Sequence, residues 1–255
     1  MTTVRGNVEV FPTANDLAVA AADRFVAAAA AAIDATESFS VALSGGSTPR
    51  ALFSLLASDA YGSRVESSRV QFFWGDERCV PPDDDASNCR MARETLLDHV
   101  PVRAASVHRI RGEDAPAAAA EQYERDLRAA FATPTGAPRV APGSRFDLVL
   151  LGLGTNGHTA SLFPHHQAVR EQTRWVMAEN VEILQTWRIT LTPAILNAAA
   201  EILFLVSGRE KATVVRRVLF GAREMDELPA QAIAPVDGRL RWMVDAAAAS
   251  ELPAT

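Results

Sequence analysis

The chain has 255 residues, 48% of them hydrophobic, which is enough for one large α/β domain or two small ones. Its formal net charge of −6 argues against a nucleic-acid partner, because the phosphates of a nucleic acid need a basic surface. A small phosphorylated ligand is not excluded, since a few local cations are enough to hold one phosphate.

The amino-terminal stretch MTTVRGNVEVF lacks the apolar core of a signal peptide. No stretch approaches the ~20 consecutive apolar residues that a membrane-spanning helix needs, so we expect no membrane partner. Cys79 and Cys89 lie ten positions apart in a polar region. Without a secretory signal we expect two reduced thiols rather than a disulfide, and a cytoplasmic protein.

The first half of the chain alternates between short apolar runs and helix-like segments. Thr13 is a suitable cap for a helix over residues 14–33, with Asp16 as its capping-box partner. The other elements expected in this half are a strand at 39–43, a helix of about ten residues with Thr48 as N-cap and Pro49 in its first position, a strand at 70–74, a helix at 87–99, a candidate strand at 106–110 and a helix at 115–131.

Residues 133–144 (TPTGAPRVAPGS) are rich in proline and glycine and would suit an interdomain linker. The strand–helix alternation continues beyond them unchanged, so we expect a surface loop inserted into a single α/β domain that covers residues 1–255. Later elements are expected as strands at 146–151, 175–178, 187–192, 201–208 and 240–244, a short helix opened by Thr192 and Pro193, a helix at 209–220 and an alanine-rich helix at the end.

This order of elements predicts an α/β fold with a doubly wound, mostly parallel, Rossmann-like sheet and helices on both faces. In such folds the functional loops follow the carboxyl ends of the strands.

The stretch FDLVLLGLGTNGHTASLFP (146–164) places a G-x-G-x-x-G motif directly after an apolar strand. A dinucleotide site would need a helix that starts inside the motif and an acidic residue at a strand end ~20 positions later. Pro164 would break that helix within two turns, and neither Glu171 nor Glu179 clearly ends a strand. We therefore expect no nicotinamide cofactor. The glycines instead allow a sharp turn that presents His158, and histidine is the commonest general base.

Two polar clusters invite a metal-site interpretation that we do not favour. His165 and His166 follow Pro164 without a cysteine or acidic partner at ligand spacing. Asp83, Asp84 and Asp85 precede the expected helix at 87–99. We interpret both clusters as solvated loops and expect no metal.

The turn at 44–49 (SGGSTP) joins a buried strand to a helix and has the features of a phosphate-binding loop. Its glycines allow close backbone approach, and the helix start supplies free N–H groups and a positive dipole. The Walker pattern is absent, which disfavours a nucleoside triphosphate and leaves a single phosphate on a small molecule. An ordinary capped turn is the structural alternative.

A matching turn occurs at 207–211 (SGREK), where Lys211 falls in the first turn of a helix. A cation there is unfavourable for the helix dipole unless an anion lies between them. Arg78 and Arg188 are two further cations near the ends of expected strands. The candidate residues for binding the phosphorylated substrate are Ser44, Gly45, Gly46, Ser47, Thr48, Asn156, Gly157, Arg188 and Lys211.

Taken together, these segments resemble the 6-phosphogluconolactonase family, within the wider group of sugar-phosphate isomerases and deaminases. The resemblance spans nearly the whole chain, in the family's order, through the stretches LSGGSTPRALFSLL, FFWGDERCVPPDDDASN, GLGTNGHTASLFP, RITLT and SGREK. It implies hydrolysis of 6-phospho-D-glucono-1,5-lactone to 6-phosphogluconate in the pentose phosphate pathway, without metal or nucleotide. The implied partner is a small phosphorylated sugar lactone, and we expect a monomer or weak homo-oligomer.

For this reaction we expect His158 to act as the general base and Arg78, or loop N–H groups, to stabilise the oxyanion. Asp76 and Glu77 would orient Arg78 or bind sugar hydroxyls. Asn156 departs from the family, whose members commonly read D-G-H at this place. An aspartate would stabilise an imidazolium, whereas the amide of Asn156 can only form hydrogen bonds.

Two alternatives remain. A glucosamine-6-phosphate deaminase would carry a glutamate where this chain has Phe163 and an aspartate where it has Asn156, so two acid/base groups of that reaction are missing. A non-catalytic sugar-phosphate sensor would usually carry a helix-turn-helix domain, and the chain has no spare basic segment for one.

Overall fold

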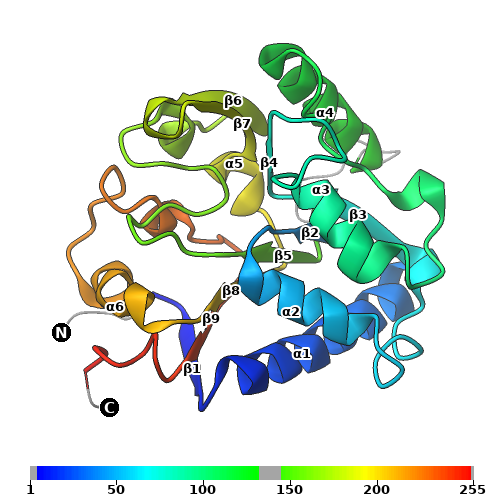
Figure 1. The fold of residues 1–255 in the computed structure, drawn as a ribbon, viewed down its shortest axis with the longest axis horizontal. Helices are drawn as coiled ribbons and strands as arrows, with labels where there is room; N and C mark the ends of the chain where they lie inside the picture. Colours follow the sequence, from blue (N-terminus) through cyan, green and yellow to red (C-terminus); the bar gives the residue numbers. More distant parts are fainter. Residues whose placement is uncertain (1–4, 132–144, 254–255) are drawn as a thin grey trace.

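The computed structural model describes residues 5–131 and 145–253. Its centre is a six-stranded sheet in which all neighbouring strands run parallel (Figure 1). In order across this main sheet the strands are β1 (Asn7–Phe11), β9 (Arg239–Asp245), β8 (Glu201–Val206), β5 (Leu148–Leu151), β2 (Phe39–Leu43) and β3 (Val70–Trp74). The expected α/β fold class is confirmed. The three central strands β8, β5 and β2 are buried along their whole length, as continuous apolar strands of parallel sheets are.

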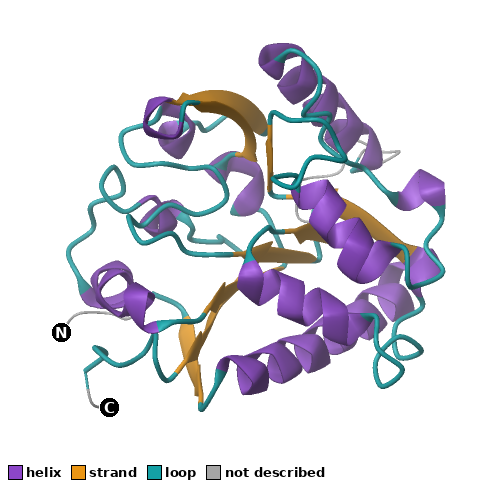
Figure 2. Cartoon of the chain, in the orientation of Figure 1, coloured by secondary structure: helices purple, strands orange, loops and turns teal. Residues whose placement is uncertain are grey.

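Helices cover both faces of the main sheet (Figure 2). The connections from β1 to β2 and from β2 to β3 advance in one direction, and their helices α1 (Ala14–Thr36) and α2 (Ser47–Leu56) pack against each other on one face. The connection from β8 to β9 runs in the opposite direction. Right-handed crossovers therefore place its helix, α6 (Ala212–Phe220), on the other face.

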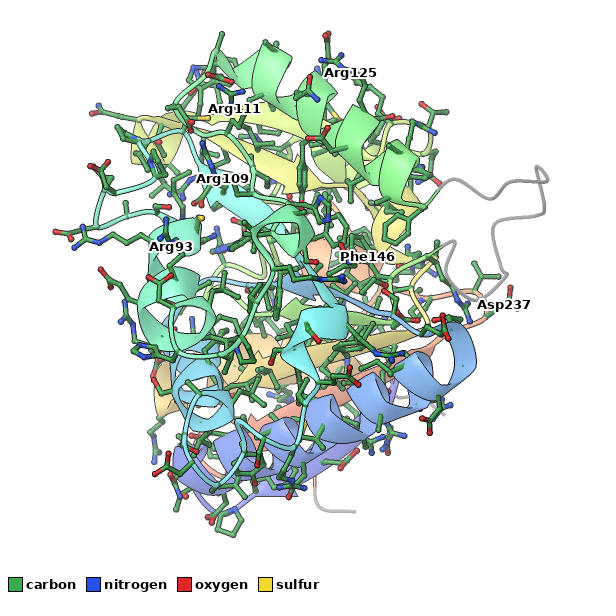
Figure 3. All side chains as sticks on the ribbon, turned by 90° about the vertical axis from the view of Figure 1, so that its right-hand side faces the viewer. Arg93, Arg109, Arg111, Arg125, Phe146 and Asp237 are labelled. Carbon is green, nitrogen blue, oxygen red and sulfur yellow. The ribbon has the colours of Figure 1, made fainter. Side chains whose placement is uncertain are left out.

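A second, three-stranded antiparallel sheet lies above the main sheet. Its strands, in order, are β4 (Asp76–Arg78), β7 (Thr186–Leu191) and β6 (Val176–Val181). Helix α4 (Pro116–Ala130) packs against β6 and β7, so the main sheet lies between this layer and the layer of α1 and α2 (Figure 3). The remaining α-helices are α3 (Asn88–Ala92) and α5 (Pro193–Leu196).

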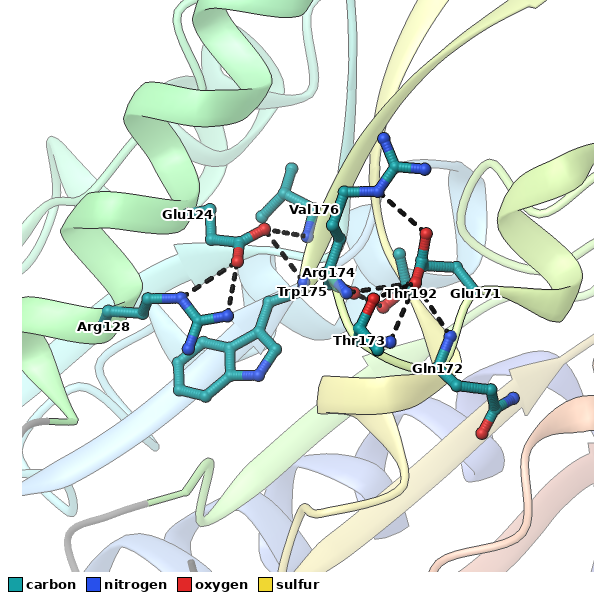
Figure 4. A network of polar contacts seen from close by, with 9 residues as sticks. All are labelled: Glu124, Arg128, Glu171, Gln172, Thr173, Arg174, Trp175, Val176 and Thr192. Atoms are coloured by element: carbon teal, nitrogen blue, oxygen red, sulfur yellow. Dashed lines mark hydrogen bonds and ion pairs between the residues drawn. The ribbon is translucent and has the colours of Figure 1, made fainter. Parts of the chain in front are cut away.

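Helix α4 also protects the start of the edge strand β6. The Glu124 carboxylate accepts hydrogen bonds from the backbone N–H groups of Trp175 (3.0 Å) and Val176 (3.2 Å), as Figure 4 shows. Arg128 holds this carboxylate and lies 4.3 Å from the centre of the Trp175 ring. These contacts satisfy groups that an open strand edge would offer to another chain.

Two of the expected elements are wrong. Instead of a strand at 106–110 the chain forms a short 3-10 helix (Ala104–Ser106), and Val107 makes only an isolated bridge to β3 before Arg109 turns away to pair with Glu113. Instead of a terminal helix, residues 246–252 form turns. The Asp245 carboxylate caps the first of them by accepting from the N–H of Ala248 (2.7 Å), and the alanine run is too short to form a stable helix by propensity alone.

Three other expectations need correction in detail. Helix α2 starts at Ser47 after Gly46, so Thr48 is not its N-cap and Pro49 is not its first residue. The strands expected at 175–178 and 187–192 exist, but they belong to the antiparallel sheet, together with β4, for which no strand was expected. Strand β1 was not expected. The loop expected at 133–144 lies outside the described residues.

No helix in the described part of the chain is both long enough and apolar enough to cross a membrane.

Tyr123 of α4 anchors the carboxyl end of the edge strand β3. Its buried hydroxyl accepts from the backbone N–H of Trp74 (2.8 Å) and donates to the carbonyl of the same residue (2.9 Å). We expect Tyr123→Phe to lower the free energy of unfolding in urea by about 1–3 kcal/mol, because two buried backbone groups lose their partner. Tyr61→Phe, whose hydroxyl bonds to the exposed Asp23, is the matched control and should cost less than about 1 kcal/mol. Equal losses in both variants would contradict this anchoring role.

Candidate active site

The cleft lies where the winding of the main sheet reverses. The chain leaves β2 toward β3 and leaves β5 toward β8, in the opposite direction, so the loops after these neighbouring strands diverge at their carboxyl ends. Ligands of doubly wound folds bind at this point. A cleft of about 310 Å³ is found there. The segments that line it are 44–49, Asp76, Arg78, Asn88, 152–154, 158–160, 205–207, Glu210 and Lys211.

The glycine motif builds a tight loop that carries His158 into this cleft. The N–H of Gly154 donates to the carbonyl of His158 (2.8 Å), and Gly157 adopts a φ of +84°, which favours glycine. A side chain at Gly154 would collide with the imidazole, since a Cβ there would lie 2.0 Å from His158 Nδ1. No helix starts within the motif, so the geometry of a pyrophosphate-binding loop is absent from this segment.

Asn156 fixes the tautomer of His158. Asn156 Oδ1 lies 3.2 Å from the backbone nitrogen of His158 and 2.6 Å from its ring Nδ1. The backbone N–H can only donate, so the amide atom that faces it is the oxygen, which can only accept. Nδ1 therefore carries the proton, and Nε2 keeps a free lone pair. Nε2 is the atom that can accept a proton.

The surroundings of His158 keep its imidazole neutral. Burial of the ring, which stacks on Phe163 with centroids 4.4 Å apart, lowers the pKa of His158 to about 4. Asp76 opposes this shift, whereas the cations Lys211, Arg188 and Arg78 add to it. The base is thus free of a proton at neutral pH, while three positive charges act on it.

The small sheet holds the His158 loop in place. Ser161 donates from its hydroxyl to Asp76 (2.6 Å) and from its backbone N–H to the Thr190 hydroxyl (3.1 Å). Further along, Glu179 accepts from the N–H of Ala168 (2.7 Å) and contacts His166 Nδ1 at 3.2 Å. The sequence led us to expect His166 in a solvated loop, but its side chain is partly buried and contacts Glu179.

The other cluster with a metal-site interpretation is exposed to solvent. Asp83, Asp84 and Asp85 lie on the surface, and Asp85 pairs with Arg90. His165 is also exposed and contacts Glu227. Among the described residues, no group of three or more histidine, cysteine or acidic side chains is arranged to hold a metal ion.

The two glycine turns meet on the other side of the cleft. Helix α2 directs its first backbone N–H groups, at Ser47 and Thr48, outward from the helix start. The Thr48 hydroxyl lies 2.8 Å from the Ser207 hydroxyl, which joins this turn to the one that carries Lys211. A Cβ at Gly45 would lie 1.9 Å from Asn88 Oδ1, so close packing requires a glycine there. Neutral donors and one ammonium group thus converge on a position suited to an anion.

Arg78 and Arg188 lie directly opposite each other on β4 and β7. Arg78 donates to the carbonyl of Ala86 and lines the cleft. Arg188 is not among the residues that line it, and its contact with the phosphate stays a prediction. Asn156 and Gly157 are also outside the lining, and they act through the position of His158.

Glu77 has a structural function. Its buried carboxylate accepts from the N–H groups of Asn88 (2.7 Å) and Cys89 (2.8 Å) and from the hydroxyl of Ser87 (3.1 Å), so it caps the start of α3. Burial raises the pKa of Glu77, and the hydrogen bonds from backbone N–H groups lower it. The effect of burial is the larger, so the pKa lies above its ordinary value. Its carboxylate also accepts from the backbone N–H of Arg78 (2.9 Å), so Glu77 contacts the backbone of Arg78 while it does not line the cleft.

Sequence reasoning missed Asn88 and Ser161, which hold Asp76 from two sides. The Asn88 amide donates to the carbonyl of Asp76 (2.9 Å) and lies 3.4 Å from its carboxylate. The capped helix start in DASN was a signal for a fixed position of Asn88. No local signal showed that Ser161 would reach a residue 85 positions away.

Comparison with known proteins decides the family. A family model described as glucosamine-6-phosphate isomerases/6-phosphogluconolactonase matches residues 12–242. The chain belongs to this family. It is 38% identical to the 6-phosphogluconolactonase of Mycobacterium tuberculosis over 255 aligned residues, which cover 97% of this chain and 98% of that one. It is 36% identical to the corresponding protein of a Nostoc species, with 98% and 99% covered.

The fold agrees with that family. The structure of 6-phosphogluconolactonase from Trypanosoma cruzi superposes with a TM-score of 0.85 at 29% identity, covering 99% of this chain and 98% of that one. The similarity in structure thus extends over nearly the whole chain, as the similarity in sequence motifs does.

The tautomer and the low pKa of His158 can be tested by NMR titration of its ring. We expect the imidazole to stay neutral on lowering the pH until about pH 4, because burial and the nearby cations disfavour the charged form. Asn156→Asp should raise the pKa of His158, since a carboxylate at Nδ1 stabilises the imidazolium. The signal is assigned by its loss in His158→Asn. A pKa that Asn156→Asp leaves unchanged would contradict the contact.

Proposed function

We propose that this protein hydrolyses 6-phospho-D-glucono-1,5-lactone to 6-phospho-D-gluconate. The observation that carries the proposal is a neutral imidazole with a free Nε2, lining the same cleft as two glycine turns that offer backbone N–H groups, hydroxyls and Lys211. A phosphate and a reactive carbonyl at opposite ends of one sugar would suit this arrangement. The relatives described above carry the name of this activity.

In the proposed mechanism the turn at 44–48 and Lys211 bind the phosphate and orient the lactone. His158 Nε2 takes a proton from a water molecule as its oxygen attacks C1, and Arg78 or loop N–H groups stabilise the oxyanion. The bond from C1 to the ring oxygen then breaks, and His158 returns the proton to that oxygen. General base catalysis contributes ~10²–10⁴-fold and one oxyanion donor ~10²–10³-fold, which suffices for an ester that is already electrophilic.

Substrate binding makes His158 a stronger base. In the empty cleft Lys211, Arg188 and Arg78 lower its pKa. A bound phosphate dianion offsets part of this positive field and raises the pKa of His158 toward the neutral range, where general base catalysis is most efficient. No acidic partner at Asn156 is needed for this change.

The two alternatives have less support. The deaminase would carry acids at the positions of Asn156 and Phe163, but here an amide contacts His158 Nδ1 and a phenyl ring stacks on the imidazole. A non-catalytic sensor would use the same cleft, and only an assay of turnover separates it from the enzyme. The cytoplasmic location and the monomeric or weakly oligomeric state stay predictions, which fractionation and size-exclusion chromatography can check.

Two glycines, one in contact with His158 and one away from the cleft, give a matched pair of variants. We expect Gly154→Ala to lower kcat at least tenfold, because its Cβ would displace the His158 ring by direct collision. Gly75→Ala should stay within about twofold of the wild type, since Gly75 does not line the cleft and a Cβ there would meet its nearest atom, the Leu43 carbonyl oxygen, at an ordinary 3.5 Å. Equal effects would show that the position of the ring does not limit turnover.

The central test is hydrolysis of freshly made phosphorylated lactone, with unphosphorylated gluconolactone as the control, in mildly acidic buffer that slows spontaneous hydrolysis. We expect a strong preference for the phosphorylated substrate. His158→Asn should cut turnover at least a hundredfold, the loss of one general base, while the affinity for 6-phosphogluconate stays nearly the same. Equal rates on both lactones would refute the phosphate site, and retained turnover in His158→Asn would refute the general base.

A further inference from the structure

Arg78 and Arg188 form a pair of like charges beside the cleft, although Arg188 also has acidic neighbours: Glu179 lies opposite it on β6, and Asp76 and Glu77 act on it electrostatically. Their side chains lie directly opposite each other on β4 and β7, at a register where neighbours in an antiparallel pair share one face. Like charges placed in this way destabilise a sheet. Neither arginine forms an ion pair with any residue between 5 and 131 or between 145 and 253.

The guanidinium groups are also short of hydrogen-bond acceptors. The Nε atoms of both arginines are buried and have no partner among the described residues. Arg78 uses one terminal nitrogen on the carbonyl of Ala86, while Arg188 makes no side-chain hydrogen bond within the described part of the chain. Buried donors of this kind normally have acceptors. Two buried Nε–H donors without acceptors beside a cleft therefore indicate a site for an anion.

The position of this couple separates it from the phosphate site. Arg78 enters the cleft from β4, whereas Lys211 and the turn at 44–48 reach it from the loops after β8 and β2. Asp76, two residues before Arg78 on the same face of β4, receives the Ser161 hydroxyl of the His158 loop. Arg78 thus lines the cleft on the side that carries the His158 loop, and Arg188, which is not part of the lining, lies next to Arg78 on β7.

Hydrolysis of the proposed substrate creates a second anion. The lactone carries only its phosphate, whereas the product carries a carboxylate at C1, because the attacking water supplies the second oxygen and the acid then loses its proton to solvent. Two guanidinium groups are well suited to a planar carboxylate, since each offers parallel N–H donors.

We propose that Arg78 and Arg188 together form a carboxylate subsite for C1 of the product, distinct from the phosphate site at 44–48 and Lys211. This inference rests on the proposed hydrolysis. It moves Arg188 from the phosphate end of the substrate, where the sequence suggested it, to the carbonyl end. The same pair faces the negative charge that develops on the carbonyl oxygen during attack. It also makes the product, with anions at both ends, a better ligand than a sugar phosphate with a neutral C1.

Calorimetric titration of two ligands tests the proposal. The first is 6-phosphogluconate, and the second is 1,5-anhydroglucitol 6-phosphate, which has the phosphate but no carbonyl or carboxylate. We expect Arg188→Gln to weaken binding of 6-phosphogluconate about 10- to 100-fold, the value of a charge-assisted hydrogen bond, and to change binding of the neutral-headed analogue less than threefold. Lys211→Met should weaken both ligands.

Two controls keep the result interpretable. Arg174→Gln removes an exposed arginine that precedes β6, and it should change neither affinity. Arg188→Gln should unfold at the same or a higher temperature than the wild type without ligand, because it relieves the repulsion from Arg78. Arg188→Lys, which keeps the charge but loses the planar donor group, should show an intermediate loss for 6-phosphogluconate alone.

An equal loss for both ligands in Arg188→Gln would return Arg188 to the phosphate site and overturn the proposal, as would no loss for either ligand. The turnover of the wild type separates this failure from that of the proposed function. If the wild type does not hydrolyse the phosphorylated lactone, the function is wrong. If it does, and Arg188→Gln does not discriminate between the ligands, only the carboxylate subsite is wrong.

Discussion

The hydrogen bond from His158 Nδ1 to Asn156 Oδ1 is the interaction on which the catalytic account depends. At 2.6 Å it assigns the proton to Nδ1 and leaves Nε2 as the only ring nitrogen able to accept one. Its acceptor carries no charge, so nothing at this contact stabilises the imidazolium. The neutral base therefore follows from the amide, from burial against Phe163 and from the surrounding cations together.

This contact is held by two layers of the molecule. The main sheet supplies the glycine loop after β5, where Gly154 gives the imidazole its room. The antiparallel sheet supplies Asp76 and Thr190, which bind Ser161 three residues after His158. A long loop without a helix would otherwise be a poor platform for catalysis, because a functional group must be held close to its productive geometry. The second sheet gives this loop a fixed polar surface and also brings Arg78 and Arg188 to its side.

Sequence reasoning was most successful where the signal was local. The apolar runs FSVAL, LVLL and EILFLV became central strands, and the turn SGGSTP met the turn SGREK because parallel strands bring their carboxyl ends to one edge. It was less successful where pairing was long-range. β4 is only three residues long, and nothing in DER indicates that it pairs with a strand more than a hundred residues later. The place of Arg188 depended on that register, so the sequence could not assign it to one end of the cleft.

The terminal alanines and SVHRI show a further limit. Both have suitable local propensity, yet the alanines form turns that the Asp245 carboxylate caps, and the segment SVHRI leads into the Arg109–Glu113 pair. Propensity is a weak preference that a few tertiary contacts can override.

The pH dependence of turnover tests the central claim most directly. The claim is that a neutral His158 acts in a field of cations that the substrate's phosphate partly cancels. The profile of kcat/KM reports the free enzyme once it is corrected for the ionisation of the free substrate's phosphate, whose second pKa is about 6, and that of kcat reports the enzyme–substrate complex. The account predicts that kcat/KM for the phosphorylated lactone falls with decreasing pH through a single proton uptake near pH 4, and that kcat falls at a higher pH. A kcat/KM limb centred near the ordinary histidine pKa of about 6.5, or a kcat limb at or below the kcat/KM limb, would contradict it.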